Sequence, residues 1–159
     1  MEVNAVTTND PPAWAHLLGY AGLVPFVFLS AAFWWPDRIS HSFISHALSS
    51  YAAVIISFLG AIHWGLEMRD MQPAATNPSP WIWGITPSLL AWLATLLTPP
   101  FDLLFMAILL WLCYRVDQKR YSHYQVASWL PMRFRLTLVA SVACMAGSVG
   151  FYTSSNAVT

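Results

Sequence analysis

The chain has 159 residues, of which 57% are hydrophobic and 9% charged. A soluble domain carries about 25% charged residues, so this composition excludes an ordinary soluble protein and favours one whose outer surface meets lipid. The formal net charge is zero, which leaves no overall field to attract nucleic acid. We therefore expect an integral membrane protein whose first partner is the lipid bilayer.

Five apolar segments follow one another along the chain, and each is interpreted as a membrane-spanning helix. A spanning helix needs about 20 residues, within a range of about 17–25. The segments are Ala13–Trp35, Ala47–Met68, Trp81–Leu97, Phe101–Tyr114 and Phe134–Tyr152. The fourth is shorter than this range and spans if Arg115 extends to the interface and the bilayer thins. The prediction is an all-α bundle of five transmembrane helices.

The intervening segments complete a single-domain organisation. Residues 13–152 are predicted to form the transmembrane domain, between a flexible N-terminal segment (1–12) and a flexible C-terminal tail (153–159). Pro25 and Pro87 are expected to bend their helices, because each removes a backbone donor. Asp37 is a candidate helix N-cap, and Met71–Pro80 is interpreted as a loop. The aromatic side chains of Tyr121–Met132 are expected to lie in the membrane interface.

The distribution of Lys and Arg predicts how the bundle is oriented. Residues 1–12 contain neither, so the N-terminus lacks the basic region of a signal peptide. With five spans, six basic residues fall on one side: Arg69, Arg115, Lys119, Arg120, Arg133 and Arg135. Arg38 falls on the other side, and taken alone it favours the reverse orientation. The larger count predicts a cytoplasmic N-terminus and an external C-terminus.

The strongest candidate for a functional site is the pair His63 and Glu67. They are four residues apart, so they share a face of the second span, and Gly60 leaves room beside them. Ionisable residues within a span are costly and often functional. The alternative is a structural one, in which Glu67 pairs with Arg133 or Arg135 and anchors two helices.

Two functions remain open at this stage. The first, which we prefer, is a non-enzymatic protein that binds a small apolar ligand, a lipid, a quinone or a membrane partner. The site would lie between spans two, three and five at the cytoplasmic end, and His63 and Glu67 would supply its polar contacts. Trp64 and Trp83 would form the walls, and Arg133 or Arg135 would contact an anionic headgroup. The second is a transporter or redox accessory subunit that uses His63 and Glu67 as proton acceptor or cofactor ligand, with His16 as a possible second haem ligand.

The sequence carries no phosphate-binding loop, nucleophile elbow or metalloprotease motif. We therefore assign no catalytic residue, and we expect neither a metal site nor a bound cofactor.

Three stretches resemble a known family. They are Leu18–Phe26, Tyr51–Gly65, which ends in Gly-Ala-Ile-His-Trp-Gly, and Trp83–Trp92, which contains Trp-Gly-Ile-Thr-Pro-Ser-Leu. They are similar to a bacterial family of unknown function whose eukaryotic relative is transmembrane protein 69, a mitochondrial membrane protein. The resemblance covers about residues 14–150 and implies a multi-pass protein of the bacterial inner membrane. It emphasises His63, Trp64, Trp83, Pro87 and Ser88.

Overall fold

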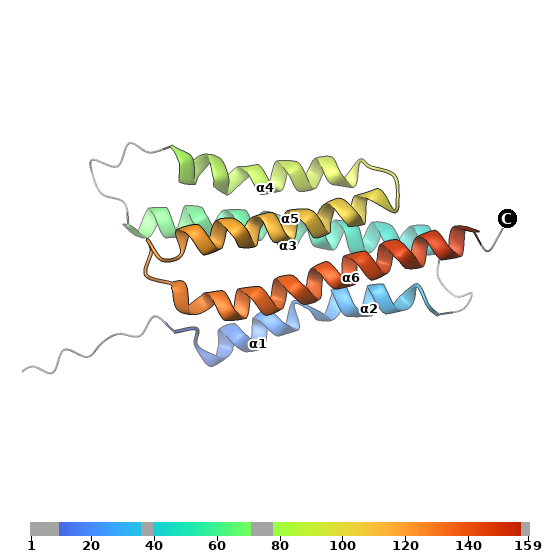
Figure 1. Ribbon diagram of the computed structural model, residues 1–159, viewed down its shortest axis with the longest axis horizontal. Helices are drawn as coiled ribbons and strands as arrows, with labels where there is room; N and C mark the ends of the chain where they lie inside the picture. The colour runs from blue at the N-terminus through green and yellow to red at the C-terminus, as the bar shows by residue number, and fades with distance from the viewer. Residues whose placement is uncertain (1–9, 36–39, 71–77, 157–159) are drawn as a thin grey trace, which may run out of the picture.

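The computed structural model describes residues 10–35, 40–70 and 78–156, and its regular structure is entirely helical there. The elements are α1 (Ala13–Ala21), α2 (Val24–Ala32), α3 (His41–Asp70), α4 (Ser79–Thr95), α5 (Phe101–Arg120), the short 3-10 helix η1 (Ala127–Trp129) and α6 (Leu130–Asn156). The helices α1 and α2 continue one another, so the bundle consists of five rods that lie side by side (Figure 1). The predicted all-α bundle is confirmed.

The first rod is broken where a proline enters it. Helix α1 ends at Ala21, and α2 begins at Val24 with Pro25 in its first turn. Proline has no backbone N–H and cannot continue the hydrogen-bond ladder of the preceding turn. At this break the Tyr51 hydroxyl of α3 donates to the Gly22 carbonyl, with an O···O distance of 2.8 Å. The bend predicted at Pro25 is therefore present, and a neighbouring helix fixes it.

Three helical stretches of the described chain are long and apolar enough to cross a membrane. They are Ala13–Ala32, His41–Asp70 and Ala127–Ser154. Helix α4 has 17 residues, and α5 carries the charged residues Asp102, Arg115, Asp117, Lys119 and Arg120, so neither meets the same requirement. The five predicted spans thus correspond to five rods, of which three have the length and composition of a transmembrane helix.

Several helices extend beyond their predicted ends. Helix α3 begins at His41, α5 continues past Tyr114 to Arg120, and α6 runs from Leu130 to Asn156. The region between the fourth and fifth predicted spans is therefore mostly helical. Within it, Asp117 and Arg133 face the protein interior instead of solvent. Predictions that concern residues 1–9, Asp37 and residues 71–77 lie outside the described part of the chain.

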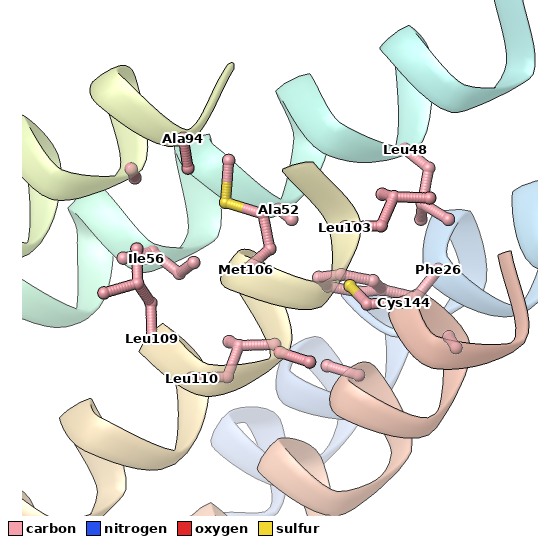
Figure 2. Close-up of a cluster of buried hydrophobic side chains, with 14 of the residues drawn as sticks. Phe26, Leu48, Ala52, Ile56, Ala94, Leu103, Met106, Leu109, Leu110 and Cys144 are labelled. Carbon is pink, nitrogen blue, oxygen red and sulfur yellow. The ribbon is translucent and has the colours of Figure 1, made fainter. Parts of the chain in front are cut away.

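The core lies where α3, α5 and α6 meet. Helices α3 and α5 run in the same direction, so that Leu48 packs beside Leu103 and Ile56 beside Leu109 (Figure 2). Helix α6 runs antiparallel to both (Figure 1). A Cβ atom added to Gly147 of α6 would lie 2.7 Å from the Leu48 side chain and 3.2 Å from that of Leu103. Gly147 of α6 therefore lies against Leu48 of α3 and Leu103 of α5, and the three helices pack closely at this point.

Candidate functional site

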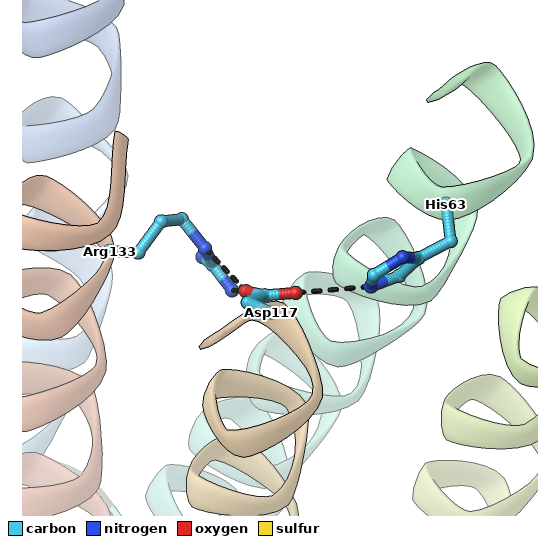
Figure 3. A network of polar contacts seen from close by, with 3 residues as sticks. All are labelled: His63, Asp117 and Arg133. Atoms are coloured by element: carbon cyan, nitrogen blue, oxygen red, sulfur yellow. Dashed lines mark hydrogen bonds and ion pairs between the residues drawn. The ribbon is translucent and has the colours of Figure 1, made fainter. Parts of the chain in front are cut away.

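A buried cluster of three ionisable side chains joins these helices at the end of the bundle where α3 and α5 finish. His63 comes from α3, Asp117 from α5 and Arg133 from α6. His63 Nε2 lies 3.1 Å from Asp117 Oδ1, while Arg133 Nε and one Nη donate to Asp117 Oδ2 over 2.9 and 2.7 Å. The two partners approach the carboxylate from opposite sides (Figure 3). All three are buried, with exposed fractions of 1%, 1% and 7%. We call these residues the triad.

The chemistry of the triad determines which nitrogen of His63 carries the proton. A carboxylate only accepts hydrogen bonds, so the Nε2 atom facing Asp117 must be the donor. In the neutral ring the Nδ1 atom then offers only a lone pair, and within the described residues it has no hydrogen-bond partner. Arg133 supplies the charge that balances Asp117. The triad is therefore a charge-balanced buried pair with an attached imidazole that retains one vacant acceptor.

Glu67 has a different partner from His63, although both side chains belong to α3. The Tyr124 hydroxyl donates to Glu67 Oε2 over 2.6 Å, and Arg69 Nη2 donates to the Tyr124 carbonyl over 2.8 Å. Burial, together with the bond to Glu67, raises the pKa of Tyr124 to about 12, so its hydroxyl stays protonated at neutral pH. The bonds fasten the last turns of α3 to the turn that follows α5. The structure thus divides the predicted pair between two separate contacts.

Trp64 of α3 lies at the contact with α4, and Trp83 belongs to α4 itself. Trp64 Nε1 donates to the Trp81 carbonyl over 2.8 Å, and its ring covers Gly84, where an added Cβ would overlap it. Trp83 is half-buried and borders a shallow hollow of about 270 Å³ beside Arg120. Arg135 is exposed on α6. Trp64 therefore acts as a packing residue between α3 and α4.

A larger apolar cavity lies on the other side of α3. Its volume is about 570 Å³, within the range of about 300–1,000 Å³ typical of ligand pockets. Its apolar walls come from α1, α3, η1 and α6, and they comprise Ala15, Leu18, Gly19, Phe58, Ile62, Leu66, Val126, Trp129, Met132 and Leu136. Arg69, Tyr121 and Arg133 supply its polar lining. Arg133 is thus the predicted site residue that connects the cavity with the triad.

A second, smaller hollow adjoins the first. It has a volume of about 150 Å³ and also borders Leu18, Gly19, Phe58, Arg133 and Leu136. From these shared residues it continues toward Phe26 and Leu110 in the core. The cavity therefore has a narrow apolar extension directed along the bundle axis.

Sequence reasoning gave no role to Asp117, and it placed Tyr121 and Tyr124 at the membrane interface. The two tyrosines are instead buried, with exposed fractions of 4% and 3%. A signal was present in the spacing, because Leu110, Cys113, Asp117 and Tyr121 are three or four residues apart and continue one buried helix face. Following that face past Arg115 would have placed Asp117 inside the bundle.

The described residues contain no group of three or more His, Cys, Asp or Glu side chains that could hold a metal ion. His16, considered above as a haem ligand with His63, is exposed on α1, and the Nε2 atom of His63 already contacts Asp117. The geometry therefore gives no support to haem ligation by these two histidines.

Comparison with known proteins places the chain in a family. Residues 11–149 match the family described as "Protein of unknown function (DUF3429)". The chain belongs to this family. It is also 34% identical over 93 residues to transmembrane protein 69 of Xenopus tropicalis, a match covering 55% of this chain and 34% of that protein. The chain thus matches about a third of the length of this curated relative. No solved structure matches the chain significantly.

The region shared with the DUF3429 family contains the triad and the cavity. His63, Asp117 and Arg133 all fall within residues 11–149, as do the residues that line the cavity. The expected relationship to transmembrane protein 69 is confirmed, and with it a membrane-type family without an assigned activity.

Proposed function

We propose that this protein binds an uncharged amphipathic molecule taken from the membrane, in the cavity between α1, α3 and α6. The cavity itself carries the proposal, because it combines extensive apolar walls with a few hydrogen-bonding groups at one place. Ligand sites in proteins commonly have this composition, with the polar groups orienting the ligand. The apolar body of the ligand would lie against Leu18, Phe58 and Leu136.

The charges around the polar lining favour an uncharged head. Arg133 is paired with Asp117, and Arg69 is paired with Asp70 over 2.8 Å. An anionic headgroup, the contact expected from the sequence for Arg133 or Arg135, would add an unbalanced charge to this set. A guanidinium has five N–H donors, and burial beside Asp117 raises the pKa of Tyr121 to about 12, which keeps its hydroxyl protonated. A carbonyl oxygen, such as that of an isoprenoid quinone, matches these donors.

We further propose that all five rods cross the bacterial inner membrane, with the N-terminus in the cytoplasm. The 17 residues of α4 extend about 25 Å at 1.5 Å per residue, near the lower limit for a span. The charges Asp102 and Asp117 of α5 are buried in the bundle and need not meet lipid. Six basic residues against one support this orientation, which places the cavity at the cytoplasmic end.

Binding can be tested through Trp129, which lines the cavity. A short-chain ubiquinone should quench tryptophan fluorescence of the purified protein saturably, and Trp129→Phe should remove most of that saturable component. Gly19→Leu should weaken binding at least about tenfold, because its side chain would occupy the cavity and displace apolar ligand contacts.

Gly65→Leu is the matched control, since a Cβ at Gly65 meets no atom within 4 Å. It should bind like the unmodified protein. Equal affinity in Gly19→Leu and Gly65→Leu, or no saturable quenching in the unmodified protein, would contradict a ligand in this cavity.

The vacant Nδ1 atom of His63 favours a second function, as a proton acceptor in a transporter or redox accessory subunit. His63 would receive a proton beside Asp117, a different partner from the Glu67 expected from the sequence. His63→Gln retains the size and hydrogen bonding of the side chain but cannot titrate. When the bound quinone is reduced by an added chemical reductant such as dithionite, it takes up two electrons and two protons to form the quinol. Loss of this proton uptake in His63→Gln, with unchanged quinone affinity, would support this function over simple binding.

A further inference from the structure

A second buried polar cluster lies at the opposite end of the bundle from the triad. It consists of Asp102 in the first turn of α5 together with Ser45 and Ser49 on α3. Their exposed fractions are 1%, 0% and 2%. Leu48 packs beside Leu103 (Figure 2). Asp102 directly precedes Leu103. Ser45 and Ser49 flank Leu48 on α3, so the register of the two parallel helices brings the three polar residues near one level. Asp102 lies about 22 Å from Asp117 along α5, so the two clusters are separate.

Three oxygen atoms of this cluster have no hydrogen bond of normal geometry within the described residues. They are Asp102 Oδ1 and the hydroxyl oxygens of Ser45 and Ser49. A buried polar group without a partner destabilises the folded state. Three such atoms at one level therefore indicate a site that an additional group would complete.

The surroundings of Asp102 differ from those of Asp117 in their charge. Asp117 pairs with Arg133, whereas no Lys or Arg forms an ion pair with Asp102 in the described part of the chain. Asp102 interacts with the backbone N–H groups of Leu103 and of Asp102 itself, with the Ser49 hydroxyl, with the exposed His46 and with the buried Cys144. The amino end of α5 offsets part of a negative charge there. The hydroxyls of Ser45 and Ser49 still form no hydrogen bond of normal geometry within the described residues.

We propose that Asp102, Ser45 and Ser49 bind one Na⁺ ion. Hard cations prefer carboxylate, hydroxyl and carbonyl oxygens over nitrogen or sulfur. One carboxylate balances one positive charge, whereas a divalent ion would leave an uncompensated charge inside the bundle.

The bound ion would stabilise the bundle. A ligand that binds only the folded state raises stability with its concentration. Na⁺ would connect α3 with α5 at this end, as the triad does at the other. This proposal does not depend on the ligand of the cavity.

Thermal unfolding of the full-length protein in detergent tests the site, at constant ionic strength with NaCl replaced by KCl or choline chloride. The midpoint should rise with Na⁺ concentration, rise less with K⁺ and not respond to choline. Asp102→Asn should abolish the Na⁺ response. Ser45→Ala and Ser49→Ala should each raise the half-saturating Na⁺ concentration about tenfold, as expected for one lost polar contact. Asp70→Asn removes an exposed carboxylate at the opposite end and should respond like the unmodified protein.

The proposal is overturned if Na⁺ and choline give equal midpoints, or if Asp102→Asn retains the Na⁺ response. Should Asp102→Asn fail to fold, infrared difference spectra of the unmodified protein decide the question. Addition of Na⁺ should perturb an ionised carboxylate band that Ser49→Ala alters. The carbonyl band of a protonated Asp102 at saturating Na⁺ would show that a proton, and not the metal ion, occupies the site.

Discussion

At the scale of single residues, the triad explains how a low-polarity bundle accommodates an aspartate. Two Arg133 nitrogens bond one oxygen of Asp117, and His63 bonds the other. A buried ion pair seldom stabilises a protein relative to well-packed apolar residues, but removal of one partner leaves a buried charge without compensation. The triad therefore makes the relative placement of α3, α5 and α6 depend on three side chains.

This dependence gives a prediction for Asp117→Asn. The change leaves the Arg133 guanidinium buried without its counter-charge, which should lower the free energy of unfolding by about 3–5 kcal/mol. Asp117→Leu combined with Arg133→Met removes both charges and should recover a substantial part of that loss. Denaturant unfolding in detergent micelles, followed by circular dichroism, measures both effects.

Asp70→Asn is the control for this experiment, because Asp70 forms an ion pair with Arg69 in which the two side chains are 41% and 48% exposed. Exposed pairs contribute little, so its unfolding curve should remain nearly unchanged. An Asp117→Asn protein as stable as Asp70→Asn would show that the triad does not hold α3, α5 and α6 in place.

At the scale of the helices, the contact between α3 and α4 depends on two glycines. A Cβ at Gly60 would lie 2.6 Å from the Gly84 carbonyl oxygen and 3.1 Å from Pro87 Cγ. Backbone cannot move aside as a flexible side chain can. Gly60→Ala should therefore lower the free energy of unfolding by about 1–3 kcal/mol through overpacking. Gly65→Ala, in open space on the same helix, should instead raise it by up to about 1 kcal/mol through helix propensity.

These opposite signs are what thermal or denaturant unfolding of the two variants should show. A stabilised Gly60→Ala protein would mean that α3 and α4 are farther apart than described. The test is specific because both substitutions add one methyl group to the same helix.

The apolar helices and the break at Pro25 could be predicted from the sequence because they depend on local composition and backbone chemistry. The end of α5 could not be placed by the same reasoning, since Arg115 and Asp117 resemble the start of a polar loop. Asp117 lies inside the bundle because Arg133 and His63 contact it from other helices. The partner of Glu67 could not be predicted for the same reason. Tyr124 lies on the turn after α5, which comes close to Glu67 only in the folded bundle.

At the scale of the whole molecule, the question is whether the hairpin of α4 and α5 crosses the membrane. Hydropathy alone disfavours α5, but average hydropathy assumes that each side chain has a similar chance of meeting lipid. Asp102 and Asp117 are each 1% exposed, and α5 contacts α3, α4 and α6. A helix shielded in this way can cross with inward-facing charges. The hairpin lies along the other rods over most of their length (Figure 1).

Labelling of single cysteines distinguishes five crossings from three. Thr98 lies in the turn between α4 and α5, Ser122 in the turn after α5, and both are exposed. The native Cys113 and Cys144 are buried, with exposed fractions of 3% and 0%, so their background reaction should be low. If all five rods cross with the N-terminus inside, a membrane-impermeant maleimide should label Thr98→Cys in intact cells and Ser122→Cys only after permeabilisation. If the hairpin stays on one side, both positions share that side and must react alike, which would reduce the protein to three crossings and place the Asp102 cluster away from the external surface.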